Sequence, residues 1–180
     1  MRRTAQLLAG IALLAGCGSE QVPTDTTAQI QPRSGLSLAS AAVNKDLAAL
    51  RRVTARFHNF KTAAAAGWAA QITPCMTDPA GTGAMGFHYG NPSLIDASVR
   101  ADSPELLLYE PDETGRLRLV AVEYIVPLSA WTSPHPPRLF NRDFRVNEAF
   151  QVWALHAWVW KENPSGMFAD WNPMVFCAHA

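Results

Sequence analysis

Apolar side chains recur every three or four residues between Ser40 and Ala66, which is the spacing of one face of an α-helix. Ser40 is a residue type that caps helix starts, and Gly67 is a residue type that ends helices. The pattern therefore predicts one long amphipathic helix over residues 40–66. Its apolar positions are Val43, Leu47, Leu50, Val53, Phe57, Phe60 and Ala64.

Strand patterns follow the predicted helix. "ELLLYE", residues 105–110, and "LRLVAVEYIVP", residues 117–127, flank the turn-forming "PDETGR" and predict a β-hairpin. "FQVWALHAWVW", residues 150–160, fits a strand or a helix, and its aromatic and β-branched content favours the strand. A glycine-rich loop encloses a shorter extended segment, residues 85–89. We predict an α+β domain, a mainly antiparallel sheet packed by one long N-terminal helix, with a small barrel as the alternative.

The strand over residues 117–127 carries an acid on its apolar side. Counted by twos, Leu117, Leu119, Ala121, Glu123 and Ile125 share one face. A buried carboxylate without a partner is costly, so such a residue usually has an ionic partner, a proton or a metal ion. Glu123 is therefore the first candidate site residue.

Two histidines also lie in apolar, strand-like segments, His88 in "MGFHYG" and His156 in "WALHAW". Two imidazoles and one carboxylate form a ligand set that suits Zn, Cu, Mn or non-haem Fe, and we favour Zn or Cu. No short spacing shows that His88, Glu123 and His156 converge. The alternative is that each is satisfied by hydrogen bonds, or by a Glu–His pair, in the core. The sequence assigns no catalytic residue and leaves open whether the protein is an enzyme.

A cluster of tryptophans suggests a different class of function, ligand binding without catalysis. Four of the six tryptophans fall between residues 153 and 171. Exposed aromatic rings such as Trp153 and Trp158 could bind glycans or hydrophobic ligands, which would make the protein a non-catalytic binding or structural module of the envelope. A tryptophan-rich core is the competing interpretation.

The N-terminus has the organisation of an export signal. Arg2 and Arg3 precede an apolar run over residues 7–14, which is too short to cross a bilayer of roughly 30 Å. "LAGC", residues 14–17, resembles the lipobox of bacterial lipoproteins, and the resemblance implies cleavage before Cys17 and a diacylglyceryl group on its thiol. Gly18, in place of aspartate, favours the outer membrane in a diderm. An ordinary secretory peptide is the alternative.

These features predict three segments: a lipoprotein signal peptide over 1–16, a flexible tether over 17–38, and a single globular domain over 39–180. The tether sequence is rich in Ser, Thr, Gln and Pro, a composition that cannot bury enough surface to offset its ordering entropy. The expected partners are the lipid bilayer, through acylated Cys17, and a small-molecule ligand. Fifteen basic and fifteen acidic residues balance, so no nucleic acid is expected to bind.

Export changes the interpretation of the two remaining cysteines. With Cys17 acylated, Cys75 and Cys177 form a single pair in a compartment that permits disulfides. A bridge closing so long a loop stabilises the fold by up to about 4.7 kcal/mol in the chain-entropy account. Two buried free thiols, or a thiolate metal ligand, are the alternatives to the predicted disulfide.

Several motifs carry a wider resemblance: "MGFHYGN", "LLLYEP", "VEY" and "LHAWVWKENPSGMFADWNP". These resemble the recurring motifs of a family of uncharacterised exported bacterial proteins with an N-terminal lipoprotein signal. The resemblance runs from Thr54 to Cys177 and departs from the family at Gly90, where a larger residue is expected. It implies export and a single domain, and it implies no reaction. His88, Glu123 and His156 all fall within the motifs.

Overall fold

The computed structural model describes residues 34–180. The predicted signal peptide, Cys17 and most of the predicted tether lie outside these residues. Among the helices of the described part, none combines the length and the apolar character needed to cross a membrane.

The helical region begins earlier than predicted and is not continuous. Helix α1 covers Ser34–Thr54, a 3-10 turn follows over Ala55–His58, and α2 covers Phe60–Ala65. Asn59, between the last two, has extended backbone angles, and its side chain accepts a hydrogen bond from the Lys61 amide at 3.0 Å. The prediction of helix in this region is confirmed. The predicted start at Ser40 and the single uninterrupted helix are wrong, because Asn59 leaves the helical conformation and caps a new helix.

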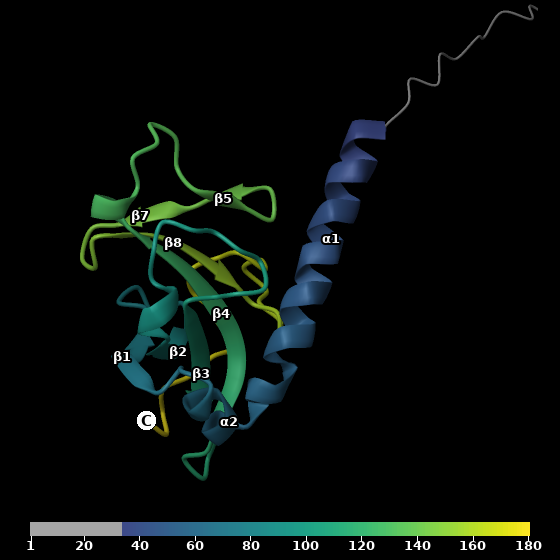
Figure 1. Ribbon diagram of the computed structural model, residues 1–180. Coiled ribbons are helices and arrows are strands. Elements are labelled where there is room, and N and C mark those ends of the chain that lie inside the picture. Colours follow the sequence, from purple (N-terminus) through teal and green to yellow (C-terminus); the bar gives the residue numbers. More distant parts are fainter. Residues whose placement is uncertain (1–33) are drawn as a thin grey trace, which may run out of the picture. The chain divides into compact units, whose positions relative to one another are not determined.

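Six strands form one antiparallel sheet in the order β1-β2-β3-β4-β8-β7. β5 and β6 form a separate two-stranded ribbon, and short 3-10 turns cover Pro92–Leu94 and Leu128–Ala130. In residues 34–180 the sheet curls but stays open, with β1 and β7 as its edges (Figure 1). The predicted antiparallel α+β fold is confirmed, and the sheet is not a closed barrel. The strands are β1 Ala70–Thr77, β2 Ala84–Gly90, β3 Leu106–Pro111, β4 Leu117–Pro127, β5 Arg138–Leu139, β6 Arg142–Asp143, β7 Arg145–Asn147 and β8 Val152–Ala157.

A β-bulge in β4 changes which side chains share a face. Leu108 pairs with Ala121 while the next residue, Tyr109, pairs with Leu119, so Val120 is an extra residue in the hairpin. Leu119 consequently packs on the opposite face from Ala121. The predicted alternation by twos is therefore wrong for Leu117 and Leu119 and holds from Ala121 to Ile125.

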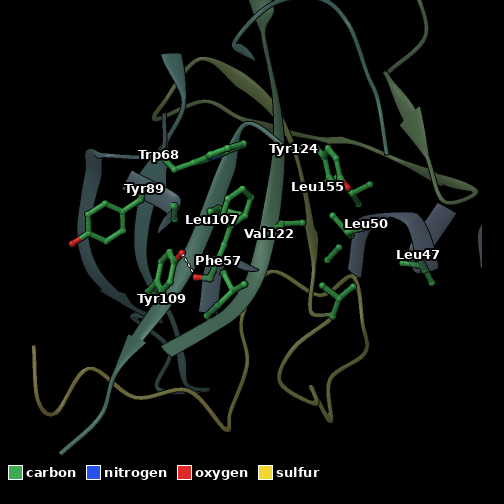
Figure 2. Packing of buried hydrophobic residues seen from close by; sticks show 14 of the residues in the cluster. Leu47, Leu50, Phe57, Trp68, Tyr89, Leu107, Tyr109, Val122, Tyr124 and Leu155 are labelled. Carbon is green, nitrogen blue, oxygen red and sulfur yellow. Dashed lines mark hydrogen bonds between the residues drawn. The ribbon is translucent and has the colours of Figure 1, made fainter. Parts of the chain in front are cut away.

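Each face of the sheet has its own apolar cluster. We call the side that packs against α1, the 3-10 turn and α2 the helix face, and Figure 2 shows its packing. We call the other side the cavity face. The helix face includes Leu107, Tyr109, Val122, Tyr124 and Leu155, packed against Leu47, Leu50 and Phe57. The cavity face includes Met85, Leu106, Leu108, Ala121, Ile125 and Trp158.

The C-terminal segment is held to the sheet at two places. Cys75 of β1 and Cys177 form a disulfide, as predicted. Ala84 of β2 and Asn172 exchange backbone hydrogen bonds of 3.2 and 3.1 Å. Val175, between these two attachments, is fully buried in the cluster on the cavity face. The disulfide thus fixes a segment that covers part of this face.

Candidate metal centre

The three predicted ligands come from three different strands and meet on the cavity face. Glu123 of β4 pairs directly with His156 of β8 and, on its other side, with Leu106 of β3. His88 of β2 pairs with Leu108, two residues further along β3. The exposed fractions of His88, Glu123 and His156 are 3%, 6% and 4%. The fold therefore brings together residues that the sequence separates by more than thirty positions.

The distances within this group suit an ion held between the side chains. The carboxylate oxygens of Glu123 lie 3.4 Å from Nε2 of His88 and 3.6 Å from Nε2 of His156. One donor atom from each residue lies within 4.8 Å of the others. Donor atoms around a tetrahedral ion with bonds of roughly 2.0–2.1 Å are about 3.3 Å apart. A charged Glu–His hydrogen bond is shorter, at about 2.7–2.9 Å, so the observed spacing fits an ion better than direct pairs.

Each histidine has a neighbour on its far ring nitrogen. Nδ1 of His88 lies 2.8 Å from the hydroxyl of Thr73, on the adjacent strand β1. Nδ1 of His156 faces a carboxylate oxygen of Asp170 at 3.8 Å, and Asp170 is itself paired with Arg145 at 2.9 Å. Metal-ligating histidines commonly have such outer partners, which set the tautomer and orient the ring. Both rings thus present Nε2 to Glu123.

Hydrogen bonding around His156 is incomplete. Both ring nitrogens are buried, and neither has a hydrogen-bond partner among the described residues. The 3.8 Å separation from Asp170 is too long for a hydrogen bond, and so is the 3.6 Å separation from Glu123. Buried polar atoms without partners are rare in native proteins. An ion at Nε2 would satisfy this atom.

Burial and mutual charge shift all three pKa values. Burial lowers the pKa of His88 to about 3, with the charge of His156 adding to the effect. Burial raises the pKa of Glu123, and His156 opposes that rise only in part. Burial alone would lower the pKa of His156, but the charges of Glu123 and Asp170 outweigh it and the pKa is raised. His88 is consequently neutral at physiological pH, which is the form that binds metal ions.

A cavity of about 360 Å³ opens beside the three residues. Thr73 and Asn147 are the neutral polar residues at its wall, and the remaining lining is apolar. Ile72 and Phe150, at 43% and 48% exposure, are large apolar side chains that stay accessible to solvent. The apolar lining consists of Ile72, Met76, Met85, Leu106, Ile125, Ala149, Phe150, Val152 and Trp171.

Gly90, the position at which the chain departs from the family resemblance, lies against this cavity. A Cβ atom there would press on the side chains of Ile72 and Leu106, which both line the cavity. The absence of a side chain at Gly90 therefore leaves space for Ile72 and Leu106 in the cavity wall.

The two tryptophans proposed as ligand-binding residues do not form one surface. Trp158 is 3% exposed on the cavity face, and its indole N–H donates to the Ala169 carbonyl at 2.7 Å. Trp153 is half-buried and packs on the helix face. The cavity is instead lined by Trp171.

Sequence reasoning did not identify Thr73 or Asp170. Thr73 lies in β1, where proline and polar residues obscure the strand pattern, and Asp170 lies in a loop without periodicity. A strand prediction over residues 70–77 would have made Thr73 a candidate neighbour of the β2 residues, but the pairing with His88 depends on the register of β1, and no local signal places Asp170.

Comparison of the chain with protein-family models, with curated proteins and with solved structures gives no match. The resemblance to exported bacterial proteins stays a prediction.

Proposed function

We propose that the protein is an exported envelope lipoprotein that binds a divalent transition metal ion through His88, Glu123 and His156. One observation carries the proposal: three buried donors face one another at ion-binding distances, and His156 has no hydrogen-bond partner in the described part of the chain. A group that served only the core would satisfy its buried polar atoms directly.

The donor set favours Zn²⁺ or Cu²⁺. Imidazole nitrogen suits these borderline ions, whereas Mg²⁺ and Ca²⁺ prefer sites built from oxygen alone. Three protein ligands leave at least one coordination position open, as in catalytic rather than structural zinc sites. The cavity lies beside this position, so a small molecule can reach the ion. The geometry assigns no reaction.

Metal titration tests the proposal. The full chain, purified without a histidine tag, should bind close to one equivalent of Zn²⁺ or Cu²⁺ by elemental analysis, with a rise in Tm on loading. His156→Asn should abolish the Tm rise. His135→Asn, at an exposed histidine outside the site, is the matched control and should leave it unchanged. If elemental analysis detects no bound metal and added metal leaves the Tm unchanged, the proposal is overturned.

Localisation is the second part of the proposal. The disulfide points to an oxidising compartment, since such bonds rarely persist in the cytosol. Together with the signal-like residues 1–16, this supports acylation of Cys17 and anchoring in the cell envelope, with the outer membrane favoured in a diderm. Mass spectrometry of membrane-extracted protein should show a lipid mass that Cys17→Ala removes. An unchanged mass in the variant would refute the anchor.

A further inference from the structure

The cavity beside the proposed metal centre indicates which ligand would reach the ion. We propose that this cavity binds an alkyl monocarboxylate, with the carboxylate on the metal ion and the alkyl tail along the apolar wall. This inference rests on the proposed function, because the ion is the group that would hold the head of the ligand.

The wall specifies an apolar tail. Leu106, which pairs with Glu123, and Ile125, two residues along β4, line the cavity beside the carboxylate. Met76, Met85, Val152 and Trp171 extend the apolar surface. Unbranched methionine side chains adapt to flexible apolar ligands. A volume of about 360 Å³ lies at the small end of ligand pockets, which suits a tail of medium length.

Charge specifies a single negative head group. Two neutral imidazoles and the Glu123 carboxylate would leave a bound divalent ion with a net charge of plus one. Asp170 and Arg145, 2.9 Å apart, form an ion pair that adds no net charge to this balance. A net charge in an apolar cavity is costly, so a monoanion that neutralises it is favoured over a neutral, cationic or dianionic ligand.

The wall offers no other cation for the head group. No lysine or arginine is among the described residues that line this cavity. The hydroxyl of Thr73, 2.8 Å from Nδ1 of His88, is polar but carries no charge. Carboxylate binding should therefore depend on the metal ion, which makes the inference testable.

Calorimetry on the full chain provides the test, with and without Zn²⁺, using butanoate, hexanoate and octanoate. Each added methylene should tighten Kd about fourfold while the tail still fits, or roughly 250-fold from butanoate to octanoate. Octanol and octylammonium should bind far more weakly than octanoate to the Zn²⁺-loaded protein.

A matched pair of variants locates the tail. Met76→Gln keeps the size of a lining side chain but adds an amide, and should weaken octanoate about tenfold while leaving butanoate and Zn²⁺ unchanged. Met174→Gln changes an exposed methionine outside the lining, and should have no effect.

The outcomes separate this inference from the proposed function. Zn²⁺ binding without octanoate binding overturns the ligand and leaves the metal site standing. Equal octanoate binding with and without Zn²⁺, or octanol binding as tightly as octanoate, overturns the role of the ion in holding the head group. Absence of Zn²⁺ binding in the same calorimeter overturns the proposed function and this inference with it.

Discussion

The two faces of the sheet are built from the same strands but treat buried polar groups differently. On the helix face the phenol of Tyr109 donates to the Phe57 carbonyl at 2.7 Å (Figure 2), and that of Tyr124 donates to Ala101 at 2.6 Å. The indole of Trp68 donates to the Pro104 carbonyl at 3.2 Å. These polar groups are buried with their partners supplied by the chain, as a stable core requires.

On the cavity face, neighbouring residues of the same strands leave polar groups incompletely paired. Glu123 and His156 alternate with the well-packed Val122, Tyr124 and Leu155 of the other face. The contrast assigns stability mainly to the helix face, and it places the incompletely paired groups where metal binding is proposed. Binding sites commonly give up some stability in this way.

Adjacent leucines of β3 give the strongest test of the contrast. Leu107 is fully buried on the helix face, whereas Leu106 lines the cavity. Leu107→Ala should lower the free energy of unfolding by about 2–5 kcal/mol, because it opens a new void in close-packed surroundings. Leu106→Ala should cost less, since one side of this residue already faces open space. Urea unfolding of both variants measures the difference, and an equal or larger loss for Leu106→Ala would contradict the assignment.

Glu105 is a second buried acid, and it shows how burial shifts the pKa of a carboxyl group that is not paired with histidine. Burial raises the pKa of Glu105 from 4.5 to about 8, although its carboxylate accepts a hydrogen bond from the Ile125 amide. The folded state therefore binds this proton more tightly than the unfolded state. The resulting stability is present below about pH 4.5 and is lost as the pH rises to about 8.

Glu105→Gln should remove this contribution. Between about pH 4.5 and pH 8, the free energy of unfolding of the wild type should fall by roughly a few kcal/mol more than that of the variant. Urea titrations of both proteins at several pH values check it. Parallel pH profiles would show that Glu105 does not carry the effect.

Removing buried polar groups should raise the free energy of unfolding on the cavity face and lower it on the helix face. Without metal, the double variant Glu123→Leu with His156→Leu should gain about 1–4 kcal/mol, because apolar residues of similar size replace an incompletely bonded buried pair. Tyr109→Phe should lose roughly 1–3 kcal/mol, because the Phe57 carbonyl loses its donor. Thermal unfolding of metal-free protein measures both. A large loss in the double variant would instead show that Glu123 and His156 serve the core as a satisfied pair.

A further test concerns metal affinity and the outer partners of the histidines. Asp170→Asn and Thr73→Val should each weaken metal affinity by about 10–100-fold, because the rings lose the groups that orient them. Competition with a chelator of known affinity measures this change. Asp143→Asn, at an exposed acid that is not part of the metal centre, should leave the affinity unchanged. Wild-type affinity in both Asp170→Asn and Thr73→Val would remove these residues from the proposed centre.

The sequence by itself determined the features that depend on local pattern. Periodicity identified helix after residue 40 and the hairpin strands β3 and β4. An acid among apolar neighbours identified Glu123, and cysteine count identified the Cys75–Cys177 bridge, both through the cost or chemistry of single residues. His88 and His156 stood out for the same reason. None of these inferences needed contacts between distant segments.

Only the tertiary structure decided what depends on register. The interruption at Asn59 and the bulge at Val120 are local departures that hydrophobic spacing does not reveal. The meeting of His88 with Glu123 across β3, and the approach of Asp170 to His156, depend on strand order and loop path. A shift of a single residue in any pairing would turn one of the three side chains to the other face, so the proposed metal centre depends on the assembled sheet.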